Sequence, residues 1–223
     1  EISETLEEII DRRARFLTEY QNTEYGIRYK AFVQEVRKNE EGSVVGQSAL
    51  TEAVARYAFK LMAYKDEYEV ARLHSSHDFR KKVRETFDGD YKLTFHLAPP
   101  LFAAKDANSG VPKKTSFGPW ILPVFTILAK MRFLRGSVFD IFGYTSERRR
   151  ERELIADYFD TVREVSNKLD QESHALAVQI AEIPEKIRGF GHIKEKNLRE
   201  AKAQEKKLLE AFHNSERRPV AAE

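Results

Sequence analysis

Hydrophobic residues recur at helical spacing along most of the chain, and this pattern predicts a mainly α-helical protein. Residues 5–87 contain several such runs, which we interpret as N-terminal helices. The first run extends for roughly 35 residues, as one long arm or as a pair of helices with a break at residues 21–23. Residues 145–212 show the same periodicity in more highly charged C-terminal helices.

A strand pattern lies between these two helical regions. Residues 91–97, YKLTFHL, alternate apolar and polar side chains, which is typical of a half-buried β-strand. Short strands are also predicted at residues 101–104 and 111–117, with a hairpin tip at residues 106–110, where DANSG supplies turn residues. We therefore expect a small antiparallel hairpin or sheet around residues 91–117.

The most apolar stretch covers residues 115–145 and contains the only Trp of the chain, Trp120. Pro119 suits the first turn of a helix and Gly136 suits its end, so a core helix is predicted over residues 119–135. The apolar part of this segment, about 14 residues, is too short to span a bilayer. We expect the polar helices of the chain to pack around this segment.

The pattern as a whole indicates a single helical domain over residues 1–213, followed by a flexible tail over residues 214–223. The sequence begins at Glu1 and not at Met, so we expect a processed chain or a segment of a longer protein.

Composition narrows the possible functions. The chain has 223 residues, a formal net charge of +2 and no Cys. Without Cys, this chain forms no disulfides and supplies no thiolate to catalysis, zinc or iron–sulfur clusters. Because the charges are balanced and interspersed, nothing calls for a nucleic-acid partner. There is no signal peptide and no transmembrane run, and we expect a cytoplasmic protein.

One loop has the features of a ligand site. The segment RGFGHIK, residues 188–194, places cationic and imidazole donors beside two glycines at the start of the last helix, which favours an anion. The ligand-binding candidates are Arg188, Gly189, Gly191, His192 and Lys194. The alternative is an ordinary turn between helices in which Phe190 fills the core.

Other chemistry-bearing residues have structural interpretations. His74, His77 and Asp78 could form half of a metal site, but a second His pair is missing, so we predict no metal site. Residues 148–150 are three arginines among glutamates, which is typical of a solvated helix surface. Lys65 falls on an apolar stripe, where we expect a structural ion pair. The pattern indicates no catalytic residue.

Five segments together resemble the C-terminal domain of the indolepyruvate ferredoxin oxidoreductases. They are LTEAVARYAFKLMAYKDEYEVARLH (50–74), YKLTFHLAPPLFA (91–103), FGPWILPVF (117–125), LRGSVFDIFGYTSERR (134–149) and IPEKIRGFGHIKEKNL (183–198). The resemblance covers nearly the whole chain, from about residue 5 to about residue 212.

The resemblance implies a parent enzyme that oxidatively decarboxylates an aryl pyruvate to an acyl-CoA and reduces ferredoxin. It also implies that thiamine diphosphate, magnesium and the iron–sulfur clusters belong to other domains, and that this segment holds no cofactor and no catalytic residue. We therefore expect an accessory and assembly domain that packs on the catalytic domains or on a second subunit. The alternative is a stand-alone helical interaction module or nucleic-acid-binding module.

Overall fold

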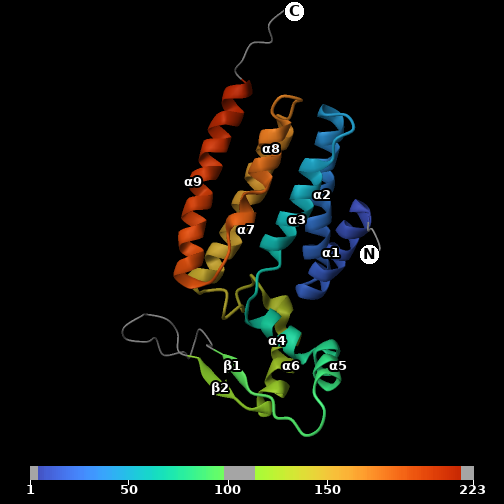
Figure 1. Cartoon of the computed structure of the whole chain (residues 1–223), viewed down its shortest axis with the longest axis vertical. Helices are drawn as coiled ribbons and strands as arrows, with labels where there is room; N and C mark the ends of the chain where they lie inside the picture. Colours follow the sequence, from blue (N-terminus) through green and yellow to red (C-terminus); the bar gives the residue numbers. More distant parts are fainter. Residues whose placement is uncertain (1–4, 98–113, 217–223) are drawn as a thin grey trace, which may run out of the picture. The chain divides into compact units, whose positions relative to one another are not determined.

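The computed structural model describes residues 5–97 and 114–216, and confirms a mainly α-helical fold with a small antiparallel sheet (Figure 1). The described elements are α1 (Leu6–Tyr20), α2 (Thr23–Ser43), α3 (Ala49–Met62), α4 (Glu67–Ser75), α5 (His77–Thr86), β1 (Phe95–Leu97), β2 (Thr115–Phe117), η1 (Pro119–Ile121), α6 (Leu122–Lys130), η2 (Met131–Leu134), α7 (Ser146–Asn167), α8 (His174–Ala181), η3 (Ile183–Lys186) and α9 (Gly191–Glu216). No helix in the described ranges is long and apolar enough to cross a membrane.

The chain divides into two compact units. Unit 1 comprises Glu1–Ala63 and Glu151–Glu223, and unit 2 comprises Tyr64–Arg150. The sequence pattern, in contrast, indicates one domain over residues 1–213. Unit 2 is therefore inserted, in chain order, between the two segments that form unit 1.

Unit 1 begins with a helical pair, which resolves the alternatives for the first apolar run. Thr5 and Glu8 form a capping box that starts α1. The run then breaks because Asn22 caps α2: its side-chain oxygen accepts a hydrogen bond from the backbone N–H of Tyr25 at 2.9 Å. Gly26 lets the two helices approach, since a Cβ there would lie 2.3 Å from Oγ1 of Thr18.

The core of unit 1 is formed by apolar faces of α1, α2, α3, α7 and α8, with α9 packed on α8. The rings of Phe32 in α2 and Phe159 in α7 stack with centroids 3.8 Å apart. The buried Tyr29 donates a hydrogen bond from its hydroxyl to the backbone carbonyl of Ala55 at 2.8 Å, as buried tyrosine hydroxyls usually find an acceptor. Burial raises the pKa of Tyr29 to about 12, so this hydroxyl stays a donor.

Unit 2 has its own core around α6. Phe125 and Ala129 of α6 are buried with Ile121, Ala71 and Phe95. The prediction that the polar helices of the whole chain pack around residues 119–135 was wrong, because the buried residues of α6 belong to this smaller cluster. The segment is also not one continuous helix. It consists of η1, α6 and η2, and prolines occupy the first turns of both η1 and α6.

The sheet of unit 2 is a short antiparallel pair. Strand β1 pairs with β2 in the register Phe95↔Phe117, His96↔Ser116 and Leu97↔Thr115. Strand β1 is shorter than the alternating pattern over residues 91–97 predicts, and residues 111–113 of the other predicted strand lie outside the described part. The predicted strand at residues 101–104 and the hairpin tip at residues 106–110 lie outside the described residues.

The C-terminal boundaries also differ from the prediction. Helix α9 continues through residues 214–216, where a flexible tail was expected, and residues 217–223 lie outside the described part. Helix α8 begins at His174, after a turn that follows α7. This turn is held by Asp170, whose carboxylate accepts the backbone N–H of Ser173 at 2.7 Å.

Candidate functional site

The predicted ligand loop at residues 188–194 connects η3 to α9 in unit 1. Gly189 and Gly191 have φ of +94° and +54°, which explains the two glycines as backbone requirements of the turn. A Cβ on Gly189 would lie 2.8 Å from Cγ2 of Ile193, so the turn is also closely packed on the first residues of α9.

The cations of this loop are paired with different carboxylates. Arg188 donates through Nη2 to the Glu185 carboxylate at 2.7 Å and through Nε to its carbonyl at 2.8 Å. Lys194 forms a salt bridge with Glu151 of α7. The two charges therefore serve two separate ion pairs, and His192 is exposed beside them. Phe190 is 78% exposed, so the alternative in which it fills the core was wrong.

The two histidines of the HSSHD motif have different environments. The ring of His74 lies among Phe79, Phe95 and Phe125, with centroids 5.1, 5.4 and 5.8 Å away. The exposed ring of His77 has Asp78 within 3.9 Å. Within residues 5–97 and 114–216, no group of three or more His, Cys, Asp or Glu residues is arranged to hold a metal.

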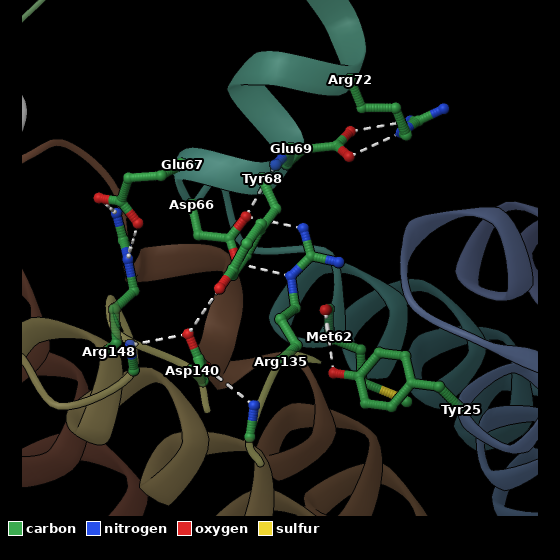
Figure 2. A network of polar contacts seen from close by, with 12 residues as sticks. Tyr25, Met62, Asp66, Glu67, Tyr68, Glu69, Arg72, Arg135, Asp140 and Arg148 are labelled. Carbon is green, nitrogen blue, oxygen red and sulfur yellow. Dashed lines mark hydrogen bonds and ion pairs between the residues drawn. The ribbon is translucent and has the colours of Figure 1, made fainter. Parts of the chain in front are cut away.

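A buried ion pair defines the polar centre of unit 2 (Figure 2). Arg135 donates from Nε and Nη2 to the two oxygens of Asp66, at 2.5 and 2.7 Å. Asp66 also caps α4 by accepting the backbone N–H of Glu69 at 2.8 Å. The sequence predicts the structural ion pair at Lys65, but Lys65 is exposed and its neighbour Asp66 is the buried partner.

A second buried carboxylate completes this network. Asp140 accepts hydrogen bonds from the backbone N–H groups of Gly136 and Gly143, at 2.8 and 2.9 Å, and from the Tyr68 hydroxyl at 3.3 Å. Burial and the nearby Asp140 carboxylate raise the pKa of Tyr68. The hydroxyl of Tyr68 is therefore a structural donor at neutral pH and not an acid or a base.

Arg148 differs from the solvated arginine that the sequence predicts. Its guanidinium is mostly buried and donates to both oxygens of Glu67, at 3.1 and 3.3 Å. Burial acts to lower the pKa of Arg148, but the bonds to Glu67 outweigh it, so the pKa is raised. Arg149 donates to the carbonyl of Tyr144 at 2.8 Å, so two of the three arginines hold the start of α7.

A buried carboxylate of unit 1, that of Glu40, has a comparable number of contacts. Glu40 accepts hydrogen bonds from the backbone N–H groups of Leu50 and Thr51, both at 2.9 Å, and from the Thr51 hydroxyl at 2.6 Å. His174 of α8 lies 2.7 Å away through Nε2. Burial acts to raise the pKa of Glu40, but these bonds outweigh it and lower the pKa.

These clusters are built to hold helices together. In the described part of the chain, the carboxylates of Glu40, Asp66 and Asp140 accept hydrogen bonds from backbone N–H groups or from a fixed cation, which holds the segments that carry these groups. The sequence did not indicate the roles of Asp66, Arg135, Asp140 and Glu40. Their hydrogen bonds to other elements join positions that are between 10 and 134 residues apart in the chain. The available local signal was Asp66 as the cap of α4.

Unit 2 also exposes a series of large apolar side chains. Eight large hydrophobic residues between positions 119 and 144 are at least half exposed in unit 2. They are Trp120, Val124, Ile127, Phe133, Val138, Phe139, Ile141 and Tyr144. Exposed apolar groups at this density along one segment mark an interaction surface more often than a solvated one.

A family model described as a family of unknown function, DUF6537, matches residues 6–207. No curated protein and no solved structure matches the chain.

Proposed function

We propose that this chain, which belongs to DUF6537, a family of unknown function, is a non-catalytic accessory and assembly domain of a larger enzyme. The observation that carries this proposal is the exposed apolar segment between residues 119 and 144 of unit 2. A surface of this kind gains stability when a partner covers it. The buried polar clusters support the proposal, because their groups are engaged in holding helices.

The parent enzyme that we propose is similar to the indolepyruvate ferredoxin oxidoreductases. In such an enzyme, thiamine diphosphate, magnesium and the iron–sulfur clusters would be held outside this chain, which has no Cys to ligate a cluster. The proposed partners are the catalytic domains of the same polypeptide or a second subunit, with ferredoxin as the electron acceptor of the parent. The proposed location is the cytoplasm.

The first test is an immunoblot of source-cell lysate with an antibody against this chain. A band far above the mass of 223 residues is expected, because the domain would be part of a large polypeptide. A band at the mass of the chain itself would require a separate catalytic subunit, which co-purification with the same antibody would identify.

The decisive test deletes residues 1–213 from that polypeptide, or removes this subunit from the complex. We expect loss of assembly on size-exclusion chromatography, together with loss of thiamine-dependent ferredoxin reduction by indolepyruvate. The matched control is Lys196→Ala in the intact enzyme, because this exposed side chain pairs with Glu200 within the same helix. An enzyme that lacks this domain and still assembles and turns over like the intact enzyme would refute the accessory role.

A further inference from the structure

Helix α6 of unit 2 has two apolar faces and buries one of them. Ile121, Phe125 and Ala129 face the core of unit 2. Trp120, Val124 and Ile127, which we call the α6 outer face, are 65%, 50% and 63% exposed. Trp120 belongs to η1 and the other two to α6, and their spacing of four and three positions is that of neighbours on one side of a helical segment.

A groove lies beside the α6 outer face. It has a volume of about 480 Å³ and is lined by Ser75, Arg80, Leu122, Pro123, Thr126 and Ile127. Arg80 is held at its edge by a hydrogen bond from Nη2 to the carbonyl of Ser75 at 2.9 Å. Its walls are apolar and its edge is cationic, a combination that accepts an apolar side chain flanked by a negative charge.

The segment that carries the α6 outer face is rich in cationic residues, of which Arg135 is paired with the buried Asp66. Residues 114–139 contain four Lys or Arg and no Asp or Glu. Lys130 is exposed and one turn from Ile127. Unit 2 as a whole holds sixteen Lys or Arg against ten Asp or Glu, a net charge of +6, whereas the two segments of unit 1 together carry −4.

We infer that the α6 outer face and its groove dock an acidic segment of a partner protein. An apolar side chain of that segment enters the groove, and its carboxylates face Arg80 and Lys130. The inference rests on the proposed assembly role and deepens it, because it names the surface and the chemistry of the partner. Charge complementarity selects this occupant over a second copy of unit 2, whose α6 outer face would carry the same positive charge.

A protein partner is also favoured over a membrane surface. Helix α6 has nine residues and buries its opposite face in the core of unit 2. A helix that lies in a bilayer interface presents a longer apolar face and a polar face to water. The groove adds a shaped pocket for a single side chain, which a lipid surface does not need.

Trp120 allows a direct test on the full chain, because it is the only Trp and lies on the α6 outer face. The probe is a synthetic helical peptide with Leu at positions i, i+3, i+4 and i+7 and Glu elsewhere. We expect saturable binding with a blue shift of Trp120 emission, weakened by added salt. The matched peptide with Lys in place of every Glu should leave the emission unchanged.

Two variants place the binding on this surface. Ile127→Glu and Lys130→Glu should each weaken binding of the Glu peptide by about tenfold or more. The matched controls are Val45→Glu and Lys196→Glu, which make the same changes at exposed positions of unit 1 and should leave the affinity unchanged. Circular dichroism confirms that each variant is folded.

Four results would overturn the inference. They are an emission that does not respond to the Glu peptide, equal responses to the Glu and Lys peptides, a response confined to phosphatidylglycerol vesicles or duplex DNA, and a concentration-dependent dimer that Ile127→Glu abolishes. The proposed function is tested separately. If the parent enzyme that carries Ile127→Glu assembles normally, only this docking surface is refuted. If the enzyme assembles normally after the domain is deleted, the accessory role is refuted.

Discussion

Glu40 shows what a single buried charge does in unit 1. Its carboxylate is fully buried, and its hydrogen bonds connect α2 to the start of α3 and to His174 of α8. Because both oxygens accept hydrogen bonds, the charged form is the one that the fold stabilises.

We expect Glu40→Gln to lower the free energy of unfolding by about 2–3 kcal/mol at neutral pH, because an amide N–H₂ would face donors. The control is Glu41→Gln, an exposed neighbour, which should change it by less than about 0.5 kcal/mol. Since the folded-state pKa of Glu40 is lowered, its contribution is complete above its ordinary pKa of 4.5 and is lost as the pH falls through the folded-state value. Urea unfolding across this range measures both effects, and equal effects of the two variants would contradict the assignment.

At His74, in contrast to Glu40, the fold stabilises the uncharged form of the side chain. Burial, with a smaller effect of Lys65, lowers its pKa, and Nδ1 is buried without a hydrogen-bond partner in the described structure. The unfolded chain takes up a proton near the ordinary pKa of 6.5, before the folded chain does. Protonation therefore favours unfolding of unit 2 below that pH.

We expect the stability reported by Trp120 emission to be constant through neutral pH and to fall between pH about 6.5 and the lower folded-state pKa. His74→Gln should flatten this part of the pH profile, whatever its effect on stability at neutral pH. His77→Gln, which changes an exposed ring three positions away, should leave the profile as it is. A profile that is the same in all three proteins would show that His74 does not titrate on unfolding.

At the scale of elements, the packing of α1 on α2 depends on Gly26. A Cβ at this position would meet Oγ1 of Thr18 at 2.3 Å and the carbonyl oxygen of Ala14 at 2.6 Å. The second atom belongs to the backbone, so a rotamer change of Thr18 cannot relieve the overlap.

Gly26→Ala should therefore destabilise the protein by about 1–3 kcal/mol, although Ala is the better helix former. Gly42→Ala is the matched control in the same helix, because nothing lies within 4 Å of the added Cβ. It should stabilise the protein by about 0.5–1 kcal/mol. Thermal unfolding followed by circular dichroism separates the two, and changes of the same sign would contradict the close crossing.

The elements themselves could largely be predicted from the sequence, and the reason is local. Helical periodicity and caps such as Thr5 involve residues within a few positions of each other, so the sequence alone is enough to indicate α1, α3 and α7. The packing of residues 119–135 could not be predicted, because helical periodicity shows that one side of a segment is buried but does not show which core it faces.

The polar clusters could not be predicted in this way. The pair of Asp66 with Arg135 joins positions 69 apart, so the local signal that Asp66 caps α4 does not reveal its partner. The loop at residues 188–194 has the composition of an anion site, but Arg188 pairs locally with Glu185, and Glu151 reaches Lys194 only after folding. Its ligand-binding role remains a prediction.

At the scale of the whole molecule, the ion pair of Asp66 and Arg135 belongs to unit 2 alone. Removing one partner of a buried pair costs about 3–5 kcal/mol, because the other charge is left without compensation. Asp66→Asn should therefore destabilise unit 2 by about this amount. The control is Asp78→Asn, since the Asp78 side chain is fully exposed.

Hydrogen exchange tests where this effect acts. Amides of α4 and α6 should exchange faster in Asp66→Asn, whereas those of α2 and α3 in unit 1 should keep most of their protection. Uniform acceleration along the chain would instead show that the two units unfold as one cooperative body.

The inserted position of unit 2 has a consequence for how the protein is made. During synthesis on the ribosome, every residue of unit 2 is added to the chain before those of α8 and α9. Helix α3 packs on α8 as well as on α1 and α2, so the part of its surface that contacts α8 stays uncovered until α8 is made. The nascent α1–α3 segment is thus the species most exposed to aggregation, and a pause in translation after residue 150 would prolong its exposure.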